Sequence, residues 1–298
     1  MRMYARVRAR AGAFAGAIGV VAGLAVPTLA LPTLQAQQVP DLKRVLYNMA
    51  DSLGMLRSVQ EVDSLMTVEF WGSGTMREVG PKDVGPPVQI KSYYAQIAYD
   101  FPGMRVEITR ASGTPAREIQ VVSGTFAWNE IDKIGGGLVP GWGSAVPAMG
   151  TATDRLLRLW TTPFGVVKAA AAAGEQTKVT AENGAVVVTF PLVNSKPGQA
   201  VNMVVGELSG TPVKVTLDAD SRPARVEVRH RNRVITTTYS NYGDLNEKDY
   251  QADIFLPARV VQTVDGQTVL DLTIAKSNTY NPYVIMPVPD AVQKAAAR

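Results

Sequence analysis

The sequence predicts a mainly β protein with some α-helix (α+β): a strongly curved antiparallel sheet, or half-open β-barrel, with helices packed at its concave face. First, residues 65–274 consist mostly of segments in which polar and apolar residues alternate, separated by turns too short for parallel crossovers. Second, residues 151–174 are the strongly helical segment inside this body. Because a long twisted sheet must close or have its apolar face covered, we expect this segment to pack against the sheet.

Residues 1–36 predict a secretory signal peptide. Four arginines lie within residues 2–10, residues 11–31 carry no charge, and a small-residue cleavage site ends at Ala36. The alternative is an uncleaved membrane anchor that contacts the bilayer through 11–31, because about 20 apolar residues can span it. The sequence thus predicts a periplasmic or secreted protein, or else a membrane-anchored one whose body lies outside the cytoplasm.

Charge and cysteine content narrow the classes of partner. The chain has 30 basic and 26 acidic residues, but four of the bases are the leader arginines, which leaves 26 of each sign in the rest. Phosphate binding needs a basic excess, so we expect no nucleic-acid partner. The chain contains no cysteine, which excludes disulfides and thiol chemistry.

An amphipathic helix is expected over 39–56. Its apolar residues recur at helical spacing, and Gly54 is placed to end it. Two interpretations are open. The helix covers one side of the sheet that follows, or it binds a partner protein.

The first half of the body predicts an antiparallel meander. We expect strands over 65–79, 89–100, 104–110, 118–122 and 125–130. Residues 134–150 show no alternation of polar and apolar residues and are rich in glycine around Trp142. This composition predicts a long loop. This loop is either a flap that carries Trp142 over an apolar mouth or a connection whose tryptophan packs on the sheet.

The helical segment 151–174 divides into two helices. Thr151 and Asp154 have the spacing of a capping box at the start of the first helix. Thr162 is expected to cap the second helix, Pro163 to occupy its first position and Gly174 to end it.

The second half predicts another meander, so we interpret 57–298 as a single β-rich domain with the helical insertion at 151–174. Strands are expected over 177–181, 185–191, 201–208, 212–218, 224–230, 234–239, 254–262 and 268–275. The predicted architecture resembles the exported lipoprotein-carrier fold, in which a curved sheet wraps helices and leaves an apolar cavity. Such a likeness does not determine function.

A closer resemblance is carried by VVSGTFAWNE (121–130), LWTTPFGVVKAA (159–170), TTYSNYGDL (237–245), FLPARVVQTVDGQTVLDLTI (255–274), GSGTMREVG (72–80) and RVEITRASG (105–113). Taken in chain order, over about residues 65–275, they resemble the β-rich N-terminal accessory domain that precedes a metallo-β-lactamase-fold hydrolase domain in some secreted bacterial proteins. Where that family typically reads Thr-Pro-His-Gly, this chain has Phe164. The family's His-x-His-x-Asp-His zinc motif is missing, so the resemblance implies the accessory domain without the catalyst.

No pattern of residues predicts catalysis, a cofactor or a metal site. His230, the single histidine, is expected on the same face of a predicted strand as two valines. It lies between two arginines, whose charge disfavours the imidazolium that a general base must form. Residues 243–253 collect four acids but lack the EF-hand pattern, so we expect a solvated loop. The glycines of 135–143 lack the lysine and hydroxyl of a phosphate loop.

These observations predict a non-catalytic, exported binding domain of the cell envelope, which holds an apolar small molecule or an envelope protein partner. The candidate contact residues are Trp142, Phe164, Trp160 and Leu138. Two alternatives stay open: a membrane-tethered structural subunit of an envelope complex, and an accessory part of a hydrolase that lacks its catalytic domain.

Overall fold

The computed structural model describes residues 41–57, 63–80, 83–113, 116–131, 144–195 and 202–297. All of them belong to one unit, residues 38–298. The predictions for 1–36, and for Leu138 and Trp142, lie outside the described residues.

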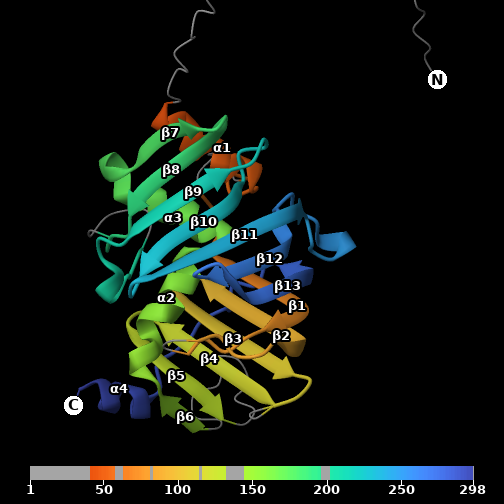
Figure 1. Ribbon diagram of the computed structural model, residues 1–298, viewed down its shortest axis with the longest axis vertical. Coiled ribbons are helices and arrows are strands. Elements are labelled where there is room, and N and C mark those ends of the chain that lie inside the picture. Colours follow the sequence, from red (N-terminus) through yellow and green to blue (C-terminus); the bar gives the residue numbers. More distant parts are fainter. Residues whose placement is uncertain are drawn as a thin grey trace, which may run out of the picture. The chain divides into compact units, whose positions relative to one another are not determined.

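Within the described residues, thirteen strands form one antiparallel sheet (Figure 1). The strands are β1 (Thr67–Met76), β2 (Val88–Ala98), β3 (Gly103–Arg110), β4 (Arg117–Ser123), β5 (Phe126–Ile131), β6 (Ser144–Pro147), β7 (Lys178–Glu182), β8 (Ala185–Pro191), β9 (Pro212–Leu217), β10 (Pro223–His230), β11 (Arg233–Gly243), β12 (Leu256–Val264) and β13 (Gln267–Asn278). The helices are α1 (Leu42–Ser52), α2 (Ala152–Trp160), α3 (Pro163–Ala173) and α4 (Asp290–Ala296). The predicted α+β class with a mainly antiparallel sheet is therefore confirmed.

The strand order explains why the helices occur in the middle of the sequence. The order is β6-β5-β4-β3-β2-β1-β13-β12-β11-β10-β9-β8-β7, so the chain starts at the centre of the sheet and runs outward to β6. It must then cross to the opposite edge before it can return to the centre through β7 to β13. Helices α2 and α3 carry the chain across (Figure 1).

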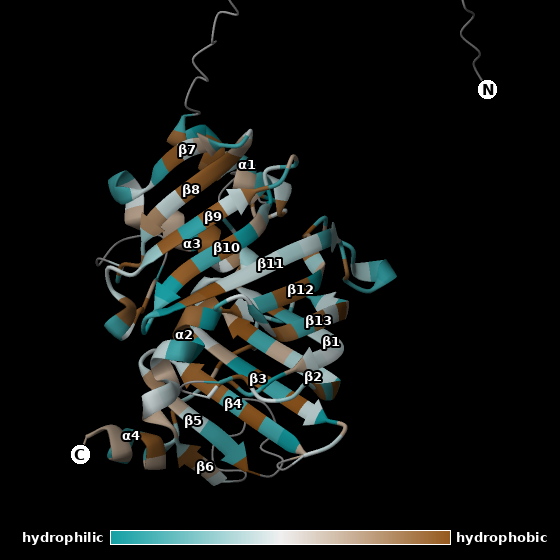
Figure 2. Cartoon of the chain, viewed as in Figure 1, coloured by the Kyte–Doolittle hydropathy of each residue, from teal (hydrophilic) through white to brown (hydrophobic). Residues whose placement is uncertain are grey.

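Helices α1, α2 and α3 pack against one face of the sheet, which we call the helix-covered face. The strands show alternate hydrophobic and hydrophilic bands in Figure 2, as expected where one face is buried. The predicted helix at 39–56 is α1, which buries Val45, Met49 and Ala50 and contacts α3 and β7. This packing supports the sheet-covering interpretation of α1.

The corner between α2 and α3 confirms the predicted boundary. Thr162 caps α3 by accepting a hydrogen bond from the Gly165 N–H at 3.2 Å, and Pro163 follows at the first helical position. A Cβ atom at Gly165 would lie only 2.5 Å from the Leu159 carbonyl oxygen, so the close approach of the two helices needs glycine there. Gly174 ends α3 with φ +55°.

The predicted capping box at Thr151 is wrong. The chain enters α2 through a 3-10 turn (Met149–Thr151), which holds Thr151 in a helical rather than an extended conformation. Its hydroxyl donates to the Ala148 carbonyl at 2.7 Å instead of accepting from the helix. Asp154 is turned toward the end of β10, where it pairs with His230 and Arg231.

The predicted strand at 201–208 is also wrong. Residues 202–205 have no strand partner, and Gly206–Leu208 form a 3-10 turn. The backbone of this segment bonds to side chains: the Val205 N–H donates to the Asn194 amide oxygen at 2.9 Å. Its apolar residues are buried because the segment lies against α2, as the bond from the Trp160 indole N–H to the Val204 carbonyl shows at 2.8 Å.

The predicted loop at 134–150 contains a short strand, β6, that pairs with β5 at the edge of the sheet. Four residues ending in a proline give too short a pattern to stand out from the glycine-rich stretch before them.

The C-terminal residues 279–297, here called the strap, cross the opposite face of the sheet. The Thr67 hydroxyl donates to the Asn281 carbonyl at 2.7 Å, and α4 lies beside β5 and β6 (Figure 1). The strap adds a second apolar cluster, with Val284, Met286 and Val292 packed against Trp128 and its neighbours. None of the described helices is long and apolar enough to cross a bilayer.

Candidate functional site

A hollow lies between the helix-covered face and the α2–α3 corner. Its deeper part, the inner chamber, has a volume of about 70 Å³. The lining is mostly apolar and comes from β1, β2, β11, β12 and β13, with Phe164 from the start of α3. Representative strand residues are Val68, Ile97, Leu256, Val260, Leu270 and Leu272.

A second space, the outer chamber, lies between α2 and strands β10 to β12 and has a volume of about 550 Å³. Its walls are formed by the apolar side chains of Leu157, Val226, Val228, Ile235 and Val264. More of the chamber's surface is apolar than polar, and its charged residues lie on α2 and at the strand ends.

Four residues line both chambers, and all four are polar: Arg158 and Thr161 on α2, Thr237 on β11 and Gln262 on β12. The Gln262 amide donates to the Thr237 hydroxyl at 3.2 Å, and the Thr161 hydroxyl donates to the Leu157 carbonyl at 2.7 Å. We call these four residues the polar junction. The two chambers thus share a group of hydrogen-bonding side chains.

Arg158 is the charged member of the polar junction. Its guanidinium donates to the Gln120 amide oxygen at 3.2 Å and forms no ion pair with a carboxylate among the described residues. Gln120 in turn donates a hydrogen bond to the Glu118 carboxylate at 2.7 Å. This carboxylate is already paired with Arg110 at 2.7 Å.

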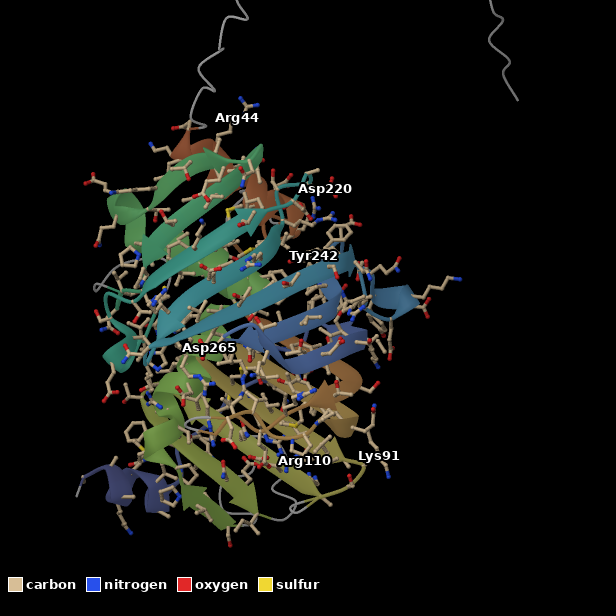
Figure 3. The ribbon with its side chains drawn as sticks, in the orientation of Figure 1. Arg44, Lys91, Arg110, Asp220, Tyr242 and Asp265 are labelled. Atoms are coloured by element: carbon tan, nitrogen blue, oxygen red, sulfur yellow. The ribbon has the colours of Figure 1, made fainter. Side chains whose placement is uncertain are left out.

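The arginines at the rim of the outer chamber differ from Arg158. Arg231 pairs with Asp154 at 3.2 Å. Arg233 pairs at 2.8 Å with Asp265, which lies at the β12–β13 turn and is labelled in Figure 3. The rim charges are therefore compensated, whereas the junction cation is not.

Buried tyrosines surround the inner chamber. The Tyr99 and Thr162 hydroxyls are hydrogen-bonded at 2.9 Å, and the Tyr239 hydroxyl donates to the Thr161 carbonyl at 2.7 Å. Burial raises the pKa of Tyr93, although the nearby Arg158 acts in the opposite direction, and burial also raises the pKa of Tyr99 and Tyr239. All three stay neutral and act as packing and hydrogen-bonding groups.

The raised tyrosine pKa values give a prediction for alkaline pH. In the unfolded chain these phenols ionise near pH 10, but in the folded protein they stay protonated at higher pH. Their contribution to the free energy of unfolding is therefore complete below about pH 10 and is lost as the pH rises further. A titration followed by tyrosinate absorbance and circular dichroism should show these tyrosines ionising together with loss of structure. Ionisation of every tyrosine near pH 10 with the circular dichroism unchanged would contradict this.

Of the four residues predicted as contacts, Phe164 and Trp160 are among the described residues, and only Phe164 lines a chamber. Phe164 is 2% exposed and lines the inner chamber. Trp160 is fully buried in the core instead, 6.3 Å from the Tyr99 ring centroid, and is absent from the lining of both chambers.

His230 lies on β10, as predicted, and faces the outer chamber at its rim. Its Nε2 atom lies 3.3 Å from the Asp154 carboxylate, which places it in the contact between β10 and α2.

The acidic loop at 243–253 is organised by Asp244. Its carboxylate accepts hydrogen bonds from the Ala252 and Asp253 N–H groups at 2.8 and 2.9 Å and from the Asn246 amide at 2.8 Å. Over the described residues, no cluster of histidine and acidic side chains is arranged to hold a metal ion.

The polar junction was not predicted from the sequence. One signal was present: Arg158 interrupts an apolar run, between Leu157 and Leu159, on a helix expected to be buried. Charged residues are seldom buried unless they are paired, so an arginine in such a helix indicates a special environment. Thr237 and Gln262 gave no such signal, because threonine and glutamine are common on strands.

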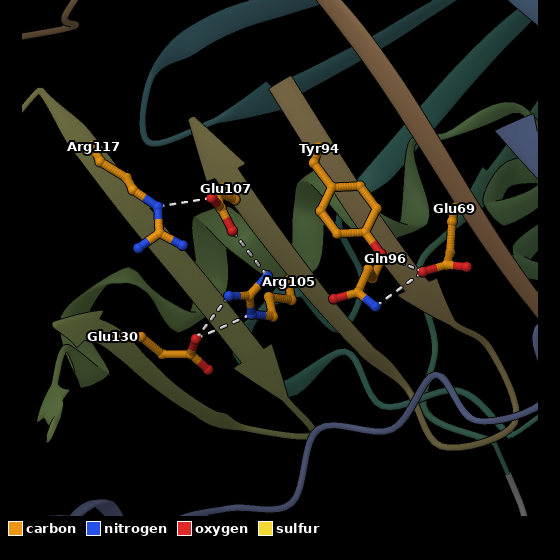
Figure 4. A network of polar contacts seen from close by, with 7 residues as sticks. All are labelled: Glu69, Tyr94, Gln96, Arg105, Glu107, Arg117 and Glu130. Carbon is orange, nitrogen blue, oxygen red and sulfur yellow. Dashed lines mark hydrogen bonds and ion pairs between the residues drawn. The ribbon is translucent and has the colours of Figure 1, made fainter. Parts of the chain in front are cut away.

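A separate polar network lies on the strap side of the sheet, in β3, β4 and β5 (Figure 4). Arg105, whose side chain is 4% exposed, pairs with Glu130 at 3.0 Å, and Arg117 pairs with Glu107 at 2.7 Å. Desolvation acts to raise the pKa of Glu107, but Arg117 and Arg105 outweigh it and lower this pKa. Every charge in this group has a partner, so we interpret the group as structural.

The network continues around Glu69 on β1. Its carboxylate accepts hydrogen bonds from Tyr94, from the Gln96 amide at 3.0 Å and from the Asn281 amide of the strap at 3.0 Å (Figure 4 shows the first two). This carboxylate therefore fastens the strap to the centre of the sheet.

Comparisons with known proteins add no assignment: neither a scan against models of protein families nor a search of curated proteins found a match to this chain.

Proposed function

We propose that this protein is an exported, non-catalytic binding protein that holds an apolar small molecule in the hollow beneath α2 and α3. One observation carries the proposal: the hollow is lined by apolar side chains from strands at the centre of the sheet, although the core around it is filled. Export is inferred from residues 1–36, which have the composition of a signal peptide.

The dimensions of the two chambers support a ligand in the outer one. Ligand sites in proteins typically have volumes of about 300–1,000 Å³ and mostly apolar walls with a few polar groups. The outer chamber, at about 550 Å³, lies in this range, whereas the inner chamber, at about 70 Å³, holds only a small group. The polar junction supplies the few polar groups that orient a ligand.

We also infer that the sheet is a half-open barrel with helices α1 to α3 in its concave face. This arrangement is supported by the strand order, in which β6 and β7 are the end strands and are not paired with each other. A sheet of this size that wraps around helices leaves space where the helices do not fill it, and the hollow lies at that place.

The proposal predicts that a bulky residue in the outer chamber abolishes binding. Ile235→Trp projects an indole from β11 into the chamber and should weaken the binding of Nile red, a neutral apolar fluorophore, by more than about tenfold. Fluorescence titration of the purified protein measures this. The matched control is Thr238→Trp, on the exposed opposite side of the same strand, which should bind as the parent does.

Two results would refute the proposed function. One is a parent protein that does not bind the fluorophore. The other is equal binding by the parent and Ile235→Trp, which would place the fluorophore on another surface, where an envelope protein partner becomes the better candidate.

A further inference from the structure

We propose that the ligand is a single-chain amphiphile with a carboxylate head, and that Arg158 binds this carboxylate at the polar junction. This inference rests on the proposed function, since it names the class of ligand for the same hollow. The observation that supports this inference is the position of one cation, Arg158, between the two chambers.

Arg158 has no carboxylate partner among the described residues, although it lines both chambers. A cation near apolar walls is costly unless an anion compensates it. Its neighbour on α2, Arg155, does not supply an anion either, because its guanidinium bonds to neutral acceptors: the Val121 carbonyl at 2.8 Å, the Trp128 carbonyl and the Asn129 amide oxygen. The junction is therefore complementary to an anion.

The head group is assigned to the junction rather than to the rim on grounds of charge. Arg231 and Arg233 at the rim are already paired with Asp154 and Asp265. A ligand anion placed at the rim would have to compete with these carboxylates. At Arg158 it would meet only neutral partners, the Gln120 amide and the Tyr93 hydroxyl.

A carboxylate suits the junction better than a phosphate monoester does. The planar guanidinium presents paired N–H groups that match a carboxylate, and the junction offers one such group beside the hydroxyls of Thr161 and Thr237. A phosphate monoester carries close to two negative charges at neutral pH and would remain undercompensated at a single arginine.

The chambers determine where the alkyl chain lies. The inner chamber is too small for it, so the chain runs from the junction along the outer chamber, over Leu157, Val228 and Ile235. A volume of about 550 Å³ accommodates one chain rather than several, which favours a fatty-acid-like ligand.

The test compares dodecanoate with dodecanol, which have the same chain length and differ in charge. Each competes with Nile red for the purified protein. We expect the parent to bind dodecanoate at least about tenfold more tightly than dodecanol, because a hydrogen-bonded ion pair is added. In Arg158→Gln this preference should fall to about twofold or less, because the ion pair with the carboxylate is lost. Arg158→Lys, which keeps the charge, should retain part of the preference.

Arg259→Gln is the matched control, because it removes the same charge from an exposed pair with Asp271 outside both chambers, and it should keep the full preference.

If the parent binds both compounds equally, the head-group assignment is overturned and the proposed function stands. If it binds neither, both fail. Loss of the preference in Arg233→Gln but not in Arg158→Gln would place the carboxylate at the rim and overturn the assignment. The comparison in the parent decides the question even if Arg158→Gln does not fold.

Discussion

Replacing Trp160 with alanine should lower the free energy of unfolding by about 3–5 kcal/mol, the range typical of Trp→Ala changes in a core. Trp160 is fully buried at the end of α2, packs near Tyr99, and donates its indole N–H to the Val204 carbonyl. Alanine would leave a cavity and an unpaired carbonyl at the point where α2 meets residues 202–205. Denaturant unfolding followed by circular dichroism measures the change.

Trp160→Phe is the matched variant, because it keeps an aromatic ring but loses the indole N–H. It should cost less than Trp160→Ala, and the difference reports the packing contribution. A change below about 1 kcal/mol for Trp160→Ala would show that this side chain is not part of the core, and would restore it as a candidate ligand contact.

Replacing Arg155 with methionine should lower the free energy of unfolding by about 3 kcal/mol. Arg155 is 6% exposed and joins α2 to β4 and β5 through the Val121 and Trp128 carbonyls and the Asn129 side chain. Methionine fills much of the space but leaves these buried acceptors without a donor, and each such acceptor costs about 1–3 kcal/mol. Burial also lowers the pKa of Arg155 to about 10, which indicates a strongly desolvated guanidinium.

An exposed arginine provides the control for this substitution. Arg225→Met removes the same side chain from an exposed pair with Glu227 on β10 and should change stability by less than about 1 kcal/mol. Thermal or denaturant unfolding of both variants makes the comparison. Equal effects of the two substitutions would mean that Arg155 does not connect α2 to the sheet.

Local patterns predicted the elements that depend on local physics. Thr162, Pro163 and Gly174 mark the boundaries of α3 because a side-chain cap, a restricted φ angle and a left-handed residue act within one or two turns of the chain. The alternation that predicted β10 and β11 reflects burial of one face, which each strand carries in its own sequence.

The failures have a common physical cause. Residues 201–208 alternate as a strand does, but the alternation reports burial against α2 rather than strand pairing. Thr151 and Asp154 have the spacing of a capping box, but Thr151 bonds within the 3-10 turn before α2, and Asp154 pairs with Arg231 beside His230 instead. For residues 201–208 and for Asp154, a contact distant in the sequence overrode a local preference, whereas Thr151 is held by the local turn.

The sequence by itself determined the antiparallel meander, the two central helices and the boundary between them, because these depend on neighbours within a few residues. Only the tertiary structure decided that the chain crosses from β6 to β7 along α2 and α3, that the strap covers one face, and that Arg158, Thr161, Thr237 and Gln262 meet at one place. Arg158 and Thr161 precede Thr237 and Gln262 by 76 positions or more, and the meeting of the two pairs depends on the strand order, which no local pattern encodes.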